Sequence, residues 1–240
     1  MIEKDLIERL ENLAEAALQE AKLAGADHAK VSASANKSWR VSAENREFSL
    51  ANSLVCSGVG IAVHCGQKRG TATVNSMSAE DVRRAVREAV SIANYSVADE
   101  HLTLATEQQC KGKVELPFLE DPSLVDYDQT YLQNLMTEVM HDCLADPKLA
   151  LERFEMGVDF DHGLLANSLG VRQAESQSHV GWSFMGMARD KDEVSGMDYT
   201  GNFSYGAVDI ASRMRSDAVG FSSKVVENLG AKKCSPYRGP

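Results

Sequence analysis

Apolar residues recur every three or four positions near the start of the chain, which predicts an amphipathic helix over residues 6–23. Leu6, Leu10 and Leu13 begin its apolar face, and Glu and Lys residues occupy the opposite face. Gly25 follows directly and can adopt the left-handed conformation that often ends a helix. We therefore expect the first helix to stop there.

Alternation of apolar and polar residues predicts strands in the next part of the chain. Residues 29–35 and 39–43 alternate in this way, and we interpret Asn36-Lys37 between them as a turn. A polar turn at residues 66–70 separates two further strands. Because these short strands follow one another along the chain, they predict an antiparallel meander.

A second helix is predicted after Ser78, with Asp81 three residues on in the pattern of a capping box. A second series of helix, strands and helix then follows. Asp126 or Asp128 can cap a third helix, several alternating segments predict strands, and a closing helix ends at Gly230. The pattern predicts an α+β fold made of two helix–β-meander–helix units with mainly antiparallel sheets.

The same pattern sets the domain boundaries that we expect. Residues 1–96 form an N-terminal α+β domain and residues 97–125 a connector, because the connector holds charges of both signs and little periodicity. Residues 126–230 form a central α+β domain. Residues 231–240 look like the start of a further, C-terminal domain.

Composition excludes several classes of function. The net charge is −10 over 240 residues, and Lys and Arg are scattered, which argues against direct nucleic-acid binding. No apolar run approaches the roughly 18–20 residues of a membrane span. The five cysteines form no CxxC pair, which is typical of reduced thiols in a cytoplasm. They are Cys56, Cys65, Cys110, Cys143 and Cys234.

The histidines do not predict a metal site. His162 follows Asp159 and Asp161, but alternation along a strand would direct it away from both carboxylates. Helical His141 has only Glu138 as a partner on the same face. The remaining histidines, His28, His64, His101 and His179, have no second ligand at a usable spacing. No serine has the glycines of a nucleophile elbow either, so we predict no catalytic and no metal-binding residue.

Residues 172–205 combine small polar residues with aromatic and Met residues at alternating positions. Such strands can line a cleft that accepts an extended peptide by strand addition. They can equally pack on a partner subunit or on another part of the protein. The candidates for peptide or partner binding are Trp182, Phe184, Met185, Tyr199 and Phe203.

Four short segments occur in order along the chain: Ala-Gly-Ala-Asp at 24–27, Gly-Val-Gly-Ile-Ala-Val at 58–63, Arg-Gly-Thr-Ala-Thr-Val-Asn-Ser-Met-Ser at 69–78 and Leu-Ala-Asn-Ser-Leu-Gly at 165–170. This ordered set resembles the TldD/PmbA family over nearly the whole chain. The last twelve residues, 229–240, resemble the junction into that family's C-terminal domain. The Asn-Ser-Leu-Gly turn is more similar to the PmbA branch than to the TldD branch.

The resemblance implies a cytoplasmic metallopeptidase system that cleaves small proteins and matures peptide antibiotics. It has also been linked to control of DNA gyrase through small toxin and antitoxin proteins. In this family a TldD-like subunit carries a zinc-binding HExxxH helix, and its PmbA-like partner generally lacks it. This chain has no HExxxH. No catalytic residue carries over to it, and zinc is expected in the TldD-like partner.

The leading interpretation is therefore a PmbA-like subunit that shapes a peptide-access cavity without supplying the chemistry. The alternative is a non-enzymatic module that captures an extended peptide or a partner protein. Because the chain looks incomplete, we also expect its apolar strands at residues 151–205 to be buried in a homodimer or higher oligomer.

Overall fold

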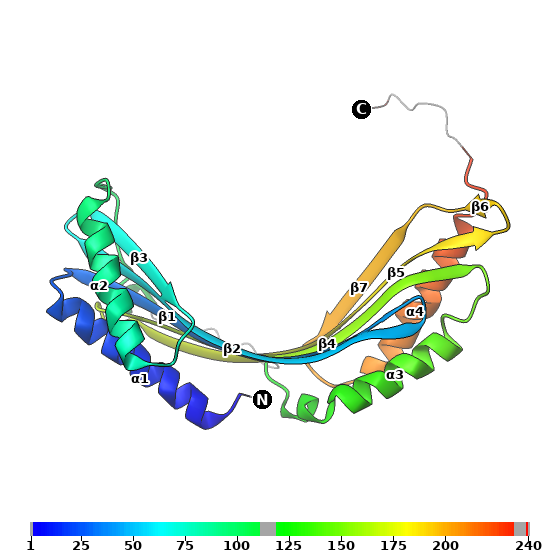
Figure 1. The fold of residues 1–240 in the computed structure, drawn as a ribbon, viewed down its shortest axis with the longest axis horizontal. Helices are drawn as coiled ribbons and strands as arrows, with labels where there is room; N and C mark the ends of the chain where they lie inside the picture. The colour runs from blue at the N-terminus through cyan, green and yellow to red at the C-terminus, as the bar shows by residue number, and fades with distance from the viewer. Residues whose placement is uncertain (1, 111–118, 233–238, 240) are drawn as a thin grey trace. The chain divides into compact units, whose positions relative to one another are not determined.

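The computed structural model describes residues 2–110, 119–232 and 239, and over these residues the fold is α+β (Figure 1). The helices are α1 (Lys4–Leu23), α2 (Ala79–Tyr95), α3 (Gln129–Asp142) and α4 (Ile210–Glu227), with short 3-10 helices η1 (Glu107–Cys110) and η2 (Pro122–Asp126). The strands are β1 (His28–Glu44), β2 (Glu47–Cys65), β3 (Lys68–Val74), β4 (Leu149–Asn167), β5 (Arg172–Asp190), β6 (Glu193–Val194) and β7 (Asp198–Ser204).

Within the described residues the strands form a seven-stranded sheet in the order β3-β2-β1-β4-β5-β6, and β7 also pairs with β5. The pairs β2–β3, β5–β6 and β5–β7 are antiparallel. These observations confirm the predicted α+β class and the antiparallel sheet. No helix in the described part of the chain is long and apolar enough to span a membrane.

The chain divides into two compact units, each built from three separate segments. Unit 1 comprises Met1–Ser38, Leu54–Glu120 and Asp159–Ser178, and unit 2 comprises Trp39–Ser53, Asp121–Val158 and His179–Pro240. Strands β1, β2, β4 and β5 each contribute residues to both units. The units are thus discontinuous, unlike the contiguous ranges 1–96, 97–125 and 126–230 expected above. Of the segment 231–240, residues 233–238 and 240 lie outside the described residues.

In unit 1, α1 and α2 lie beside each other on one side of the strands (Figure 1). Small residues let these elements approach closely: a Cβ atom on Gly70 of β3 would meet the backbone of α2 at Ala89 and Ala93. Arg87 of α2 makes an ion pair with Glu20 of α1 at 2.6 Å. The buried side chains of the two helices are Leu10, Leu13, Ala14, Ala17, Ala21, Val82, Ala85, Val86, Ala89 and Ala93.

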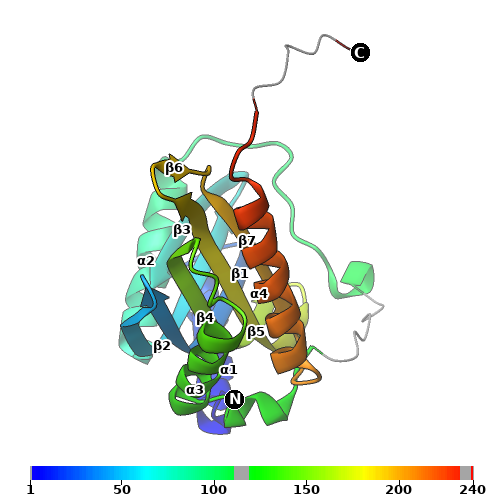
Figure 2. The same cartoon turned by 90° about the vertical axis from the view of Figure 1, so that its right-hand side faces the viewer.

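In unit 2, α3 and α4 pack next to each other and bury larger side chains than the helices of unit 1 (Figure 2). Phe184 of β5 is fully buried, with its ring centroid 4.6 Å from that of Phe154 and 5.7 Å from that of Phe221. The buried apolar side chains of these helices are Leu132, Leu135, Met136, Val139, Met140, Ile210, Met214, Ala218, Phe221 and Val225.

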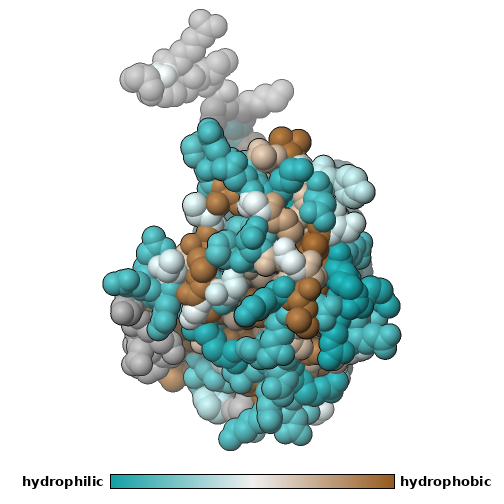
Figure 3. Space-filling model, turned by 90° about the vertical axis from the view of Figure 1, so that its left-hand side faces the viewer, coloured by the Kyte–Doolittle hydropathy of each residue, from teal (hydrophilic) through white to brown (hydrophobic). Residues whose placement is uncertain are grey.

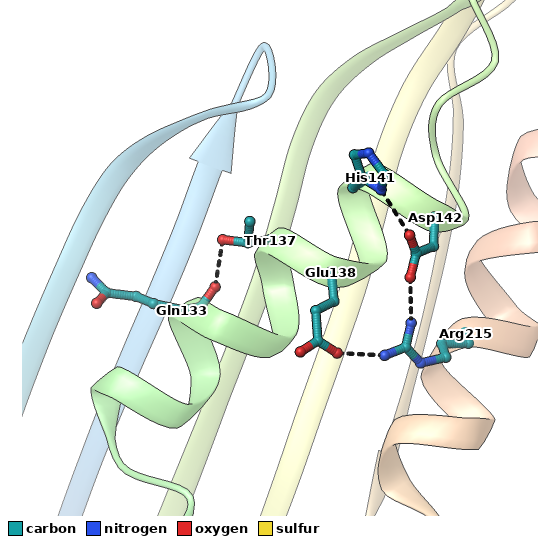
Figure 4. Close-up of polar contacts among 6 residues, drawn as sticks. All are labelled: Gln133, Thr137, Glu138, His141, Asp142 and Arg215. Carbon is teal, nitrogen blue, oxygen red and sulfur yellow. Dashed lines mark hydrogen bonds and ion pairs between the residues drawn. The ribbon is translucent and has the colours of Figure 1, made fainter.

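A polar contact also joins α3 to α4 (Figure 4). The guanidinium of Arg215 reaches the carboxylates of Glu138 at 2.5 Å and Asp142 at 3.2 Å. Nδ1 of His141 lies 2.8 Å from Asp142 Oδ1. The hydrogen bond with His141, followed by the charges of His141 and Arg215, lowers the pKa of Asp142. The contact therefore depends on an ionised Asp142.

The predicted helix signals are confirmed. Gly25 follows α1 with φ of 87°. Ser78 caps α2, where its hydroxyl accepts from the Asp81 N–H at 3.4 Å. Of the two candidates for the third helix, Asp128 is the cap, because its carboxylate accepts from the Tyr131 N–H at 2.8 Å.

The predicted turn at Asn36-Lys37 is wrong, because β1 continues through both residues as one strand of 17 residues. Two polar residues in succession suggested a break. In the structure, the side-chain amide of Asn36 instead donates a hydrogen bond to Asp161 Oδ1 of β4 at 2.8 Å. A cross-strand partner thus replaces the turn. In this part of the chain, two long strands, β1 and β2, and the shorter β3 replace the expected series of short strands.

Candidate functional site

A groove with a volume of about 870 Å³ lies on the sheet of unit 1. Burial alternates along this part of β1: Ala33 is buried, whereas Ser32 and Ser34 are exposed and line the groove. Because neighbouring residues of a strand point to opposite faces, these serines and the groove lie on the face opposite Ala33. This open face is the first candidate site.

Glycines and short polar side chains form the surface of this groove. Gly60 lies against Ser32, and a Cβ atom on Gly60 would be 2.8 Å from the Ser32 hydroxyl oxygen. Gly163, in contrast, has no atom within 4 Å of such a Cβ. The polar lining includes Ser34, Asn36, Ser57, Thr73, Asn75, Asp161, Glu175 and Gln177. The groove thus offers hydroxyl, amide and carboxylate groups for hydrogen bonds.

The Asp159-Phe-Asp161-His162 segment is arranged as alternation predicts. The Asn36 amide donates to both carboxylates, at 3.4 Å to Asp159 and 2.8 Å to Asp161. His162 instead places Nδ1 2.9 Å from the Ser176 hydroxyl of β5. Its Nε2 is buried and has no hydrogen-bond partner among the residues that the structure describes. His162 and the two carboxylates therefore contact different side chains.

A zinc site does not fit the donor set of the described residues. In residues 2–110, 119–232 and 239, no three His, Cys, Asp or Glu side chains come together in a group that could hold a metal ion.

Two of the predicted binding residues lie in the core of unit 2. Trp182 is 3% exposed, and its indole N–H donates to Asp217 Oδ2 at 2.8 Å. Phe184 is fully buried. Alternation predicted two faces for β5 but did not show which face α3 and α4 cover. Neither side chain is accessible to a peptide or partner in this structure.

The other predicted residues lie at or near the surface of unit 2. Tyr199 is 63% exposed and Phe203 54% exposed, and both belong to β7. Met185 is half-buried and is the register partner of Tyr199. Tyr205, which follows β7, contacts Phe203 with ring centroids 5.5 Å apart. We call Tyr199, Phe203 and Tyr205 the β7 aromatic row, and it is the second candidate site.

The structure also brings together two histidines that sequence spacing did not connect. His28 of β1 and His64 of β2 meet edge to face, with ring centroids 6.5 Å apart. They belong to different strands, so only the register of those strands could have revealed the pair.

The face shown in Figure 3 is mostly hydrophilic, with hydrophobic residues in small groups between the polar ones.

Residues 29–93 match a family model, that of the PmbA/TldA metallopeptidase domain 1. These residues run from the start of β1 to the last turn of α2, and they include part of the groove in unit 1. A comparison of the sequence with curated proteins found no match.

Three solved structures share the fold. TldE from Thermococcus kodakarensis has a TM-score of 0.74 and 18% identity, over 90% of this chain and 47% of that chain. A candidate modulator of DNA gyrase from Bacteroides thetaiotaomicron has a TM-score of 0.83 and 18% identity, over 98% and 52%. A candidate modulator from Thermotoga maritima has a TM-score of 0.75 and 13% identity, over 94% and 50%.

The chain spans about half the length of the solved structures that it matches. Their TM-scores show a shared fold, and at this low sequence identity they show the fold alone. The residues that match the family model form most of β1 and α2 and all of β2 and β3. The resemblance seen in the sequence is thereby confirmed: residues 29–93 match the model of the PmbA/TldA metallopeptidase domain 1.

Proposed function

We propose that this chain is a PmbA-like member of a TldD/PmbA-type peptidase system. It shapes the access of a peptide or small protein, and a TldD-like partner supplies the zinc-dependent cleavage. The family match at residues 29–93 carries this proposal. Its setting is the cytoplasm, as the sequence resemblance implies.

Two surfaces support a role in handling peptides. The groove of unit 1 offers short hydroxyl, amide and carboxylate side chains, which suit the backbone groups of an extended chain. The β7 aromatic row of unit 2 leaves Tyr199 and Phe203 more than half exposed. Exposed aromatic residues are enriched where proteins bind one another. The β7 aromatic row is therefore the surface that we assign to a partner or substrate.

The named structural relatives suggest the partner and the pathway. One of them is TldE, which supports pairing of this chain with a TldD-like subunit. Two others are described as candidate modulators of DNA gyrase. A net charge of −10 disfavours contact with DNA, so any gyrase-related effect of this chain would act through small proteins.

The test is peptide turnover by the purified chain, by a TldD-like subunit and by their mixture, followed by mass spectrometry. We expect cleavage to require the TldD-like subunit and its zinc, and to increase when this chain is present. Replacing Phe203 with Ser should weaken that increase. Val219→Ser is the matched control, because Val219 is an exposed apolar residue of α4, 51% exposed, that does not belong to the β7 aromatic row. Cleavage by this chain alone that depends on one of its residues would overturn the proposal.

The alternative is a non-enzymatic binding module, favoured by the same exposed aromatic residues. Tight capture of a peptide without any turnover, even with the TldD-like subunit present, would support it instead. A homodimer could also bury the β7 aromatic row and so remove its exposed aromatic side chains from water. Light scattering that shows a monomer at tens of micromolar would contradict the dimer.

A further inference from the structure

Four basic or potentially basic side chains gather on the sheet of unit 1. His28 and Lys30 come from β1, His64 from β2 and Arg69 from β3. The His28 and His64 rings meet at 6.5 Å, and Arg69 is the register partner of His64. His28 and Lys30 are two residues apart on one strand, so they share a face. Together these four residues form what we call the basic cluster.

None of the four side chains has a counter-charge in the part of the chain that the structure describes. No ion pair or side-chain hydrogen bond joins His28, Lys30, His64 or Arg69 to another described residue. His64 is only 4% exposed, and its ring makes no hydrogen bond with another described residue. Its ring nitrogens are not fully buried, so they remain within reach of a ligand at the surface.

The electrostatic surroundings of His64 also indicate an excess of positive charge around the basic cluster. Burial lowers the pKa of His64, and the positive charges of His28, Arg69 and Lys30 lower it further. The nearby acids are engaged elsewhere: Asp27 accepts from the Gly66 N–H at 2.6 Å, and Asp99 accepts from the His101 N–H at 2.9 Å. Glu100 lies 3.5 Å from His101. The cluster is thus a local positive region on a chain of net charge −10.

We propose that the basic cluster binds an oxyanion, a carboxylate or phosphate group of a ligand. The Arg69 guanidinium provides a planar fork of donors that matches such a group, and Lys30 provides a second positive charge. The two imidazoles provide further donors. A bound anion would favour the protonated form of His64, so binding would take up a proton. The proposal does not rest on the peptidase assignment.

The first experiment follows the histidine side-chain signals by NMR at constant ionic strength. One arm adds inorganic phosphate. The other adds a short peptide with a free C-terminal carboxylate, with the same peptide amidated as its control. We expect saturable shifts of the His28 and His64 signals, and tighter binding at pH 6 than at pH 8. Shifts with phosphate alone identify a phosphate site, and shifts with the free carboxylate alone identify a peptide or organic-acid site.

Variants then test the cluster itself. Arg69→Gln and Lys30→Gln should each weaken binding about tenfold, since each removes a charge-assisted contact. Arg83→Gln is the matched control, because it removes one exposed positive charge from α2 outside the cluster. Circular dichroism checks that each variant folds. The proposal fails if neither anion gives saturable shifts, if chloride gives the same shifts, or if Arg69→Gln and Arg83→Gln weaken binding equally.

Discussion

Gly70 of β3 lies directly against Ala89 of α2, so closely that a Cβ atom on residue 70 would overlap the Ala89 carbonyl oxygen. The same Cβ would also meet the backbone nitrogen of Ala93, 2.6 Å away. Both obstacles are backbone atoms of a helix, which cannot move aside as the end of a flexible side chain can. The absence of a side chain at residue 70 therefore sets how closely α2 packs on the sheet.

The first prediction is that Gly70→Ala destabilises the protein by about 1–3 kcal/mol or more, because α2 must shift away from β3. Gly163→Ala is the matched control: it is also a strand glycine of unit 1, but its Cβ would have no atom within 4 Å. We expect the control to change the free energy of unfolding by less than about 1 kcal/mol. Urea denaturation measures both. Equal losses in the two variants would contradict the packing argument.

The second prediction separates core from surface among the aromatic residues of unit 2. Phe184→Ala should lower the free energy of unfolding by about 3–5 kcal/mol, because it leaves a cavity between Phe154 and Phe221. Phe203→Ala should change it by about 0.5 kcal/mol or less, because Phe203 is 54% exposed. Thermal or chemical denaturation measures the two values. A large loss for Phe203→Ala would show that the β7 aromatic row is a structural feature and not a docking surface.

The third prediction concerns the contact between α3 and α4 shown in Figure 4. Arg215→Met should lower the melting temperature by about 2 °C or less, because Glu138 and Asp142 are more than half exposed to solvent. Salt at 0.5 M should remove most of that difference by screening. Lys191→Met is the control for loss of one positive charge. A loss that does not respond to salt would mean that Arg215 acts through packing alone.

The fourth prediction is a pH dependence that Asp121 controls. Its carboxylate accepts from the Ala207 N–H at 2.8 Å and from the N–H and hydroxyl of Ser123 at 2.9 and 2.7 Å. The bond from Ala207, followed by those from Ser123, lowers the pKa of Asp121 in the folded state. The folded state thus binds the proton less readily than the unfolded state. The stabilisation is present above the unfolded pKa of about 3.9 and is lost as pH falls through the lower folded pKa.

We therefore expect Asp121→Ala to destabilise the protein by about 1 kcal/mol at pH 5 and pH 7, with a smaller difference near pH 2. Urea denaturation at these three pH values measures it. Asp126→Ala is the control, because Asp126 is exposed and makes no side-chain hydrogen bond within the described residues. A difference from the wild type that stays the same at pH 2 would refute the role of the ionised carboxylate.

The helices could be predicted from the sequence because their signals are local. Gly25, Ser78 and Asp128 act within one turn of the helix ends that they mark, and each does so in the structure. The strands were harder to predict. Asn36 is polar like a turn residue, but its partner Asp161 comes from a segment 125 residues away. No local pattern contains that partner.

The candidate sites show the same limit. Tyr199 and Phe184 both lie in strands whose sequence alternates, so the pattern treats them alike. Only the positions of the helices decide that Phe184 is buried and Tyr199 is exposed. His28 and His64 became neighbours through strand register, which depends on pairing and not on spacing along the chain. The sequence could therefore name Tyr199 and Phe203 as candidates, but it did not connect His28 with His64.

The pairing of β1 with β4 has a consequence for biosynthesis. Asn36 and Asp161 are 125 residues apart, and Ala29 and Ser168 are 139 residues apart, yet both pairs are hydrogen-bonded in unit 1. When the ribosome has completed α1, β1, β2, β3 and α2, one edge of β1 still lacks its neighbour. That edge stays open to mispairing until β4 has been synthesised. Unit 1 is thus a structure that translation begins early and can complete only late.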